Sequence, residues 1–260
     1  MRQPSTDVYF DEIRASAARL ADIVGAHDPD LPVPTCPDWT LRQLATHVGR
    51  VHRWATEIIA TRAAERVPFD SAPDGKNPAA PADSAAWLVA GAERVVDAIA
   101  AAGDDPVWAF GRLAPATFWA RRQAHETAMH RIDAELAAGR PVVLDADLAA
   151  DGIDEWLEIV TSPRNRGRHD LTEALPAGTA LHLRATPDSR RDDEAADWIV
   201  RRTADGLSLQ RGPGDADASV SGPAYRLLLA LVRRIPADDP ALAVTGDAAL
   251  FAGWLAGTPF

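Results

Sequence analysis

Two residues in the middle of the chain, Glu126 and His130, carry side chains that bind divalent metal ions and are four positions apart. In a helix this spacing places both side chains on one face, one turn apart. His47, far upstream, would supply a third ligand. Three protein ligands with an open fourth position are typical of a catalytic zinc site. A metal ion bound in this way can lower the pKa of a water or thiol ligand, or polarise a carbonyl group.

The Glu–His pair alone is a weak signal, because solvent-facing pairs at this spacing are common. His47 strengthens the hypothesis, since a histidine on the apolar face of a helix needs a polar partner. The alternative for His47 is a core histidine bonded to a backbone carbonyl. His52 and His125 are expected to be surface residues, or else to lie close behind the ligands. Three residues separate Glu126 from His130, so the pattern differs from the His-Glu-x-x-His motif and Glu126 is expected to be a ligand.

Other candidate reactive groups are few. Cys36 is the only cysteine, which excludes an intrachain disulfide. Its place in a proline-rich loop favours a small, half-buried side chain over a nucleophile. The chain has no glycine-rich phosphate loop and no Gly-x-Ser-x-Gly motif. The arginines Arg164, Arg166 and Arg168 could bind an anion, although a solvated linker is the more common role of such a run.

The composition indicates a globular protein with a substantial core. Of 260 residues, 47% are hydrophobic and 25% are charged. The net charge of -11 argues against binding to nucleic acid or to anionic membranes. Neither a signal peptide nor a membrane-spanning stretch is recognisable, so the expected location is the cytoplasm. A monomer or a weak homodimer is expected.

The residues that could bind metal fall in segments with helical periodicity. The pattern predicts helices over residues 5–25, 40–62, 83–102 and 115–138, separated by loops that include residues 67–82 and 103–114. The second helix has the strongest signal, because Thr40 and Gln43 have the spacing of a capping box. Pro115 is expected to open the fourth helix. Four helices joined by moderate loops indicate a four-helix bundle, assigned to residues 1–146.

The second half of the chain, residues 147–260, has a mixed pattern. A helix at about 147–161 is followed by strands with period-2 alternation, expected at 179–186, 197–202, 206–211, 218–220 and 242–244. Further helices are expected from Pro223 to about Arg234 and over 247–256. Strands and helices that do not alternate regularly indicate the α+β class.

Several segments together resemble the mycothiol-dependent maleylpyruvate isomerase family. The segment CPDWTLRQLATHV, residues 36–48, resembles one block of that family, and residues 121–133 resemble its second signature. Residues 218–224 and 244–248 resemble parts of its second domain. The resemblance implies a DinB-like bundle that holds a divalent metal, usually zinc, through His47, Glu126 and His130. It also implies a C-terminal domain like those of sterol-carrier proteins.

The resemblance further implies an enzyme that uses mycothiol, the low-molecular-weight thiol of actinobacteria, as a thiol cosubstrate on a small electrophile. The reaction would be an isomerisation or an S-transfer. An arginine of the C-terminal helix would hold a substrate carboxylate. Arg234 fits this role best, and Arg233 lies beside it. The alternative role of Arg234 is that of a helix C-terminal cation, which interacts favourably with the helix dipole. The loop at 67–82 carries only Lys76 where a second substrate-binding arginine is expected. The alternative functions are a non-catalytic metal- or ligand-binding regulatory module and a hydrolase that uses a zinc-bound water.

Overall fold

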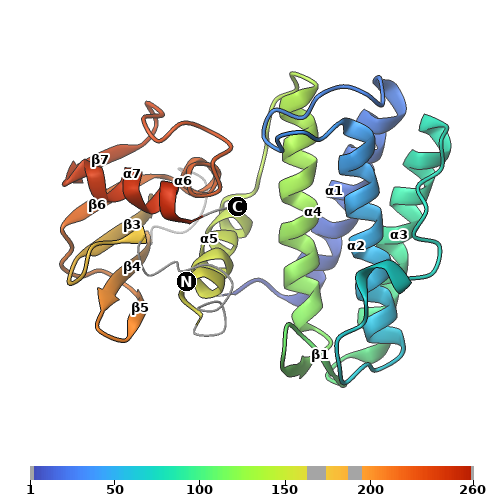
Figure 1. The fold of residues 1–260 in the computed structure, drawn as a ribbon, viewed down its shortest axis with the longest axis horizontal. Coiled ribbons are helices and arrows are strands. Elements are labelled where there is room, and N and C mark those ends of the chain that lie inside the picture. Colours follow the sequence, from blue (N-terminus) through green and yellow to red (C-terminus); the bar gives the residue numbers. More distant parts are fainter. Residues whose placement is uncertain (1–2, 163–173, 187–194, 259–260) are drawn as a thin grey trace. The chain divides into compact units, whose positions relative to one another are not determined.

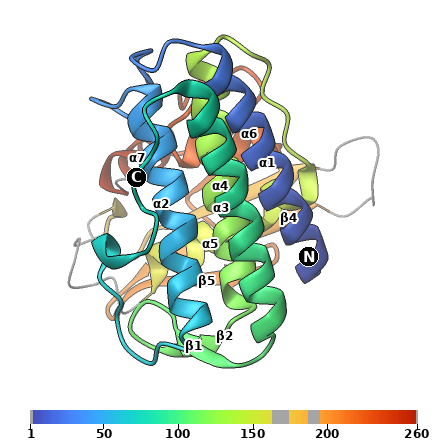
Figure 2. The same cartoon turned by 90° about the vertical axis from the view of Figure 1, so that its right-hand side faces the viewer.

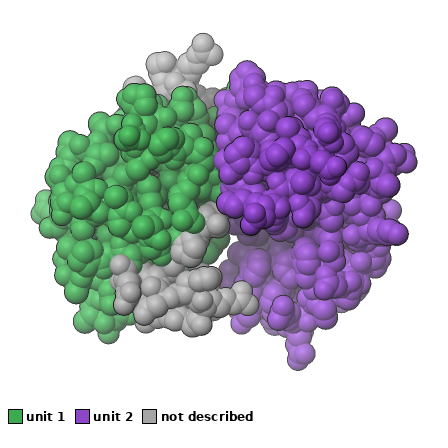
Figure 3. All heavy atoms as spheres, turned by 45° about the horizontal axis from the view of Figure 1, so that its top comes forward, with its two compact units in different colours: residues 1–4, 143–260 green, residues 5–142 purple. Residues whose placement is uncertain are grey.

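The computed structural model describes residues 3–162, 174–186 and 195–258, so the arginines Arg164, Arg166 and Arg168 lie outside the described residues. Its contacts divide the chain into two compact units. One unit comprises Ser5–Val142, and the other comprises Met1–Pro4 with Val143–Phe260 (Figure 3). Among the described residues, no helix is both long enough and apolar enough to cross a membrane.

The first unit is a bundle of four helices (Figures 1 and 2). These are α1 (Thr6–Ala26), α2 (Leu41–Ala60), α3 (Pro81–Ala102) and α4 (Phe118–Ala137). Helix α1 packs against α3 and α4, and α2 packs against the same two helices. Fully buried apolar side chains such as Leu20, Leu44 and Ile99 fill the space between them. Their burial follows the helical periodicity of the sequence.

The connections in this unit contain short elements where the sequence pattern predicts loops. A single helical turn, η1 (Phe69–Ser71), follows α2, and a hairpin of β1 (Pro106–Trp108) and β2 (Leu113–Pro115) precedes α4. Pro115 therefore ends a strand, and the prediction that it opens a helix is wrong. The following backbone N–H of Ala116 bonds to Asp105 O, which keeps this segment in the hairpin.

Two predicted helix ends also differ from the structure. Helix α3 begins at Pro81 rather than at residue 83, because proline at the first helical position loses no hydrogen bond. Helix α1 continues through Gly25 to Ala26, and the N–H of His27 closes it by bonding to Ile23 O.

The second unit combines helices with a five-stranded sheet, which confirms the predicted α+β class. Its elements are α5 (Ala146–Thr161), β3 (Ala180–Thr186), β4 (Ala196–Thr203), β5 (Gly206–Arg211), β6 (Ala218–Pro223), α6 (Ala224–Leu231), β7 (Ala243–Gly246) and α7 (Ala248–Gly257). The strand order is β5-β4-β3-β6-β7, and only the β3–β6 pair is parallel. Helices α5 and α6 pack on the sheet. Alternate residues such as Leu181 and Leu183 are fully buried there.

The helix α6 is shorter than predicted. It ends at Leu231, and the expected continuation to Arg234 is wrong. Arg233 has a φ of 58°, in the left-handed region, which ends the helical path. The N–H of Arg234 then bonds back to Leu229 O. Both arginines therefore lie in a turn after the helix.

A chain of polar contacts links three neighbouring strands of the sheet. His182 Nε2 lies 2.7 Å from Asp197 Oδ1, and His182 Nδ1 lies 3.0 Å from Ser219 Oγ. These residues belong to β3, β4 and β6, and His182 and Ser219 are directly paired in register. Each polar group thus finds a partner beside it on the sheet.

Candidate metal centre

The start of α2 is set by the capping box that the sequence predicts. The Thr40 side chain accepts a hydrogen bond from the N–H of Gln43, and the Gln43 side-chain oxygen accepts one from the N–H of Thr40 at 2.7 Å. These reciprocal bonds satisfy two backbone donors that the helix itself leaves unpaired. His47 lies in the second turn of the helix that begins here. The cap therefore fixes where the helix that carries this histidine begins.

Helix α4 supplies the other two candidate ligands on one face, as their spacing predicts. His47 Nε2 lies 3.0 Å from Glu126 Oε1, and His130 Nε2 lies 3.3 Å from the same oxygen. The rings of His47 and His130 meet edge to face, with centroids 4.8 Å apart. The tertiary structure thus brings together three side chains from two helices that are far apart in the sequence.

The geometry of these three groups fits a divalent cation. Around a tetrahedral ion with bonds of about 2.1 Å, neighbouring ligand atoms lie about 3.4 Å apart. The two nitrogen–oxygen distances of 3.0 and 3.3 Å are close to that value. Two imidazoles and a carboxylate form a donor set that suits zinc. The side chains of His47 and Glu126 are 29% and 23% exposed, so the group is partly accessible to solvent.

A buried carboxylate, Asp133, lies directly behind His130. Its Oδ2 is 2.9 Å from His130 Nδ1, and it also accepts a hydrogen bond from the Cys36 thiol at 3.3 Å. The Thr35 hydroxyl donates to Asp133 Oδ1 at 2.6 Å. When Asp133 accepts a hydrogen bond from Nδ1–H, the lone pair of a neutral His130 ring is on Nε2. Nε2 is the atom that faces Glu126. Asp133 was not predicted to belong to the site, although its i,i+3 spacing from His130 was a usable signal.

Cys36 is half-buried, as predicted. Its sulfur, His130 and Asp133 form a second cluster of potential ligand atoms within 4.8 Å of one another. His130 belongs to both clusters, through one ring nitrogen in each. The loop before α2 thus contributes directly to the surroundings of the candidate ligands.

The electrostatics of the site favour an ionised carboxylate. Burial alone would raise the pKa of Glu126, but hydrogen bonds from His130 and His47 and the charge of Arg122 hold that pKa well below its usual range. Arg122 Nη2 donates to Glu126 Oε2 at 2.6 Å, which leaves Oε1 for the two histidines. Glu126 is therefore an anion at neutral pH.

Burial would by itself lower the pKa of His130. Hydrogen bonds with Asp133, Cys36 and Glu126 outweigh it and raise that pKa well above the usual value. Without a metal ion His130 therefore carries a second proton at neutral pH. A cation that binds Nε2 has to displace this proton.

An aromatic side chain covers the two histidines. The Trp39 ring is stacked on His130 at a centroid distance of 6.1 Å and lies 5.0 Å from the ring of His47. Trp39 immediately precedes the capping residue Thr40, so the same local motif that starts α2 also places this ring. It restricts the positions that both imidazoles can adopt.

The two remaining histidines of this region lie outside the ligand clusters. His52 is fully buried, with Nε2 2.9 Å from Thr127 Oγ1, so the prediction that it is a surface residue is wrong. Burial and the charge of Arg53 lower its pKa to about 3, and it is neutral. His125 is half-buried, and its ring lies 6.1 Å from that of Tyr9. Within the described part of the chain, neither metal-ligand cluster includes His125.

The two candidate arginines belong to the second unit and differ in their burial. Arg234 is buried, and its Nη1 donates a hydrogen bond to Val232 O at 2.8 Å. Arg233 is exposed. Its backbone conformation, described above, turns the chain between the two side chains.

Comparison with known proteins gives consistent matches over most of the chain. The model of the mycothiol maleylpyruvate isomerase N-terminal domain matches residues 10–135, and the model of the MDMPI C-terminal domain matches residues 147–253. Two solved structures, the mycothiol-dependent maleylpyruvate isomerase and a histidine-to-alanine mutant of it, are each 15% identical to this chain. Each aligns with a TM-score of 0.56, over 88% of this chain and 90% of that chain, which shows a shared fold. No curated protein matches the chain.

Proposed function

The chain belongs to the mycothiol-dependent maleylpyruvate isomerase family, and we propose that it is a divalent-metal, mycothiol-dependent isomerase or S-transferase acting on a small electrophile. The observation that carries the proposal is the convergence of His47 Nε2 and His130 Nε2 on Glu126 Oε1. Residues 1–146 would form the metal-binding domain and residues 147–260 the C-terminal domain. The enzyme would act in the cytoplasm, where low-molecular-weight thiols are kept reduced.

The proposed metal is zinc, held by His47, Glu126 and His130. When bound, such an ion supplies Lewis-acid chemistry, including a lowered pKa for a thiol ligand, and the thiolate is the nucleophilic form of a thiol. The protein side chains prepare the site for it. Glu126 supplies one negative charge, and Arg122 occupies its second oxygen. Asp133 orients His130 through Nδ1.

The proposed substrate is a small electrophile that carries a carboxylate. Arg234 is the proposed binding group for that carboxylate, because a guanidinium can donate two parallel hydrogen bonds to it. Its burial supports this choice over the exposed Arg233. A buried guanidinium loses less binding strength to competing water.

The test combines metal analysis with thiol binding. Elemental analysis should find about one zinc ion per chain in the wild type, and none in His47→Ala. His125→Ala is the matched control, because His125 lies on α4 but in neither ligand cluster. Mycothiol should bind, by calorimetry, only to the metal-loaded proteins. Metal without thiol binding would favour the zinc-water hydrolase, and a wild type that cannot bind metal would overturn the proposal.

A further inference from the structure

The two carboxylate oxygens of Glu126 have different partners. Oε1 faces the two histidines, with His47 Nε2 at 3.0 Å and His130 Nε2 at 3.3 Å. Oε2 accepts a hydrogen bond from Arg122 Nη2 at 2.6 Å. A hydrogen bond between two charged groups is stronger than one between neutral groups. Arg122 thus binds one oxygen of a candidate ligand, and the other oxygen faces the candidate metal site.

The position of Arg122 follows from α4 itself. Arg122 and Glu126 are four residues apart, so they lie on one face of the helix, one turn from each other. Both side chains are largely buried, with exposed fractions of 18% and 23%. Limited exposure to water strengthens the hydrogen bond between them. A guanidinium is not deprotonated in proteins, so this donor persists at every pH at which the protein is folded.

Metal affinity alone does not explain the presence of Arg122. A positive charge beside a metal site repels the cation, and the repulsion is stronger where the surroundings are partly buried. A neutral side chain at this position would avoid that repulsion. The contact between Arg122 and Glu126 therefore has a role other than attracting the ion.

The coordination chemistry of the carboxylate supplies this role. A carboxylate can bind a divalent cation through one oxygen or through both. With one oxygen, Glu126 and the two histidines supply three ligand atoms, and a tetrahedral ion keeps a fourth position for an external ligand. With both oxygens, the same residues supply four ligand atoms and complete the tetrahedron. The hydrogen bond from Arg122 occupies Oε2 and so opposes the second arrangement.

We propose that Arg122 is a positioning residue that keeps Glu126 bound to the metal ion through one oxygen, so that a coordination position stays open for the thiol. The inference rests on the proposed function, and it adds a residue that acts through a ligand. It also separates two properties of the site. Metal binding requires the three ligands, whereas thiol binding at the metal requires Arg122 as well.

The test uses Arg122→Met in the full chain, because methionine keeps an unbranched side chain and donates no hydrogen bond. The infrared difference spectrum between zinc-loaded and zinc-free protein reports how Glu126 binds. The separation of the two carboxylate stretching bands is larger for binding through one oxygen than for binding through two. We expect a smaller separation in Arg122→Met than in the wild type. Arg122→Lys retains a charged donor and should recover the wild-type separation.

Thiol binding gives a second readout when cobalt(II) replaces zinc, because a thiolate bound to cobalt(II) produces a charge-transfer absorption band. The probe is 2-mercaptoethanol, which is small and has no carboxylate that could contact Arg122. Cobalt(II) should still bind to Arg122→Met, since all three ligands remain. The affinity of this cobalt-loaded variant for the thiol should fall by about tenfold or more. A purely structural role of Arg122 would reduce stability and leave the infrared separation unchanged.

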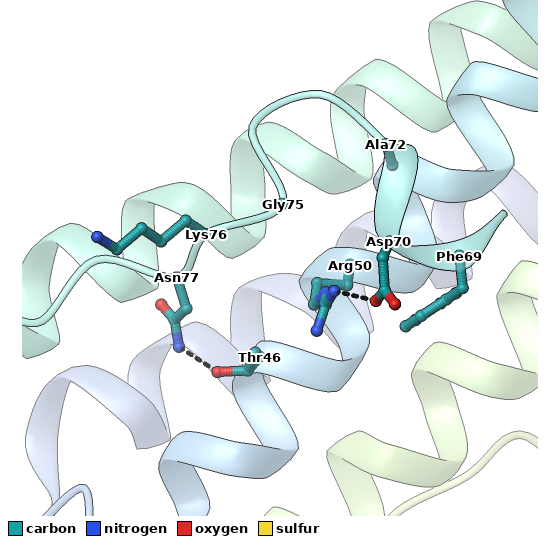
Figure 4. A pocket seen from close by; sticks show the side chains of 8 residues that line it. All are labelled: Thr46, Arg50, Phe69, Asp70, Ala72, Gly75, Lys76 and Asn77. Atoms are coloured by element: carbon teal, nitrogen blue, oxygen red, sulfur yellow. Dashed lines mark hydrogen bonds and ion pairs between the residues drawn. The ribbon is translucent and has the colours of Figure 1, made fainter.

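Arg50→Met is the matched control. Arg50 lies on α2, three residues after His47, and its guanidinium pairs with the carboxylate of Asp70. This pair lies at a cavity of about 500 Å³ between α2 and residues 69–77, which Asn77 also lines (Figure 4). Among the described residues, neither ligand cluster includes Asp70. The control thus removes an arginine one turn from a candidate ligand, and its infrared separation and thiol affinity should match those of the wild type.

The outcomes separate this inference from the proposed function. An infrared separation in Arg122→Met equal to that of the wild type would overturn the inference and leave the proposed function intact. Equal changes in Arg50→Met and Arg122→Met would also overturn it, because they would show a general effect of removing an arginine. A metal-loaded wild type that binds neither 2-mercaptoethanol nor mycothiol would contradict the proposed function. The infrared comparison would still decide whether Arg122 controls how Glu126 binds.

Discussion

Asp133 holds His130 through a hydrogen bond of 2.9 Å between Asp133 Oδ2 and His130 Nδ1. The carboxylate is fully buried, and the loop before α2 anchors it through Thr35 and Cys36. The orientation of a candidate ligand on α4 thus depends on a loop nearly a hundred residues earlier. Carboxylate–histidine pairs of this kind fix the tautomer and the ring orientation of metal-binding histidines.

Replacing Asp133 should therefore weaken metal binding without removing a ligand. We expect Asp133→Ala to lower the zinc affinity by about 10–100-fold, since His130 loses its orienting partner. A competition titration with a chelating dye measures this change. Asp133→Asn keeps an acceptor for the Nδ1 proton and should recover part of the affinity. An unchanged affinity in Asp133→Ala would show that the ring is held by other contacts.

The zinc affinity should also depend on pH. In the metal-free protein the pKa of His130 lies well above its usual value, because Asp133, Cys36 and Glu126 outweigh the effect of burial. As the pH falls through this raised pKa, a proton occupies the nitrogen that the ion needs. The apparent affinity should then fall by up to about tenfold per pH unit. Removing the charge in Asp133→Asn should shift the midpoint to lower pH.

The measurement is the apparent dissociation constant for zinc from about pH 6 to about pH 9, in buffers that do not bind the metal. Circular dichroism at each pH shows whether the protein remains folded. A dissociation constant that is independent of pH over this range would contradict the raised pKa of His130. The same midpoint in the wild type and in Asp133→Asn would contradict the role of the carboxylate.

His52 should make the protein sensitive to acid. Its pKa is about 3 in the folded state, because of burial and the charge of Arg53, and it is about 6.5 in the unfolded chain. The unfolded state therefore takes up a proton that the folded state excludes. Stability is complete above about pH 6.5 and is lost as the pH falls toward 3. At pH 5 the expected loss is about 2 kcal/mol.

Urea unfolding followed by tryptophan fluorescence at about pH 7.5 and about pH 5 tests this expectation. The difference in unfolding free energy between the two pH values should be smaller in His52→Gln, which has no titrating ring. Identical differences in the two proteins would assign the acid sensitivity to other groups.

Two helical glycines should respond in opposite ways to replacement by alanine. A Cβ at Gly49 would lie 1.9 Å from the Trp87 ring, so the α2–α3 contact has to shift. We expect Gly49→Ala to destabilise the protein by about 1–3 kcal/mol. A Cβ at Gly25 meets only Ala85, at an ordinary 3.8 Å. Gly25→Ala should raise the unfolding free energy by about 0.5–1 kcal/mol, through the helix propensity of alanine.

Thermal and urea unfolding of the two variants are measured side by side with the wild type. Because both substitutions add the same methyl group to a helix, the difference between them isolates the contact with Trp87. Equal effects of the two substitutions would show that the Trp87 ring moves away at little cost.

The sequence by itself determined the elements whose signals are local. The capping box at Thr40 and Gln43 depends on residues three positions apart, and the helical face shared by Glu126 and His130 depends on residues four apart. The strands β3, β4, β5 and β6 are six to eight residues long, so the alternation that predicts them is also local. Patterns of this kind reflect backbone geometry that needs no knowledge of the neighbouring elements.

Only the tertiary structure decided which side chains meet. The burial of His52 depends on how α2 packs against its neighbours, and the strand that ends at Pro115 depends on its pairing with β1. The anchoring of Asp133 by Thr35 and Cys36 joins segments that are distant in the sequence. The cavity beside Asn77 exists only because a loop lies over α2. Such contacts depend on packing between distant segments, which the periodicity along the chain does not predict.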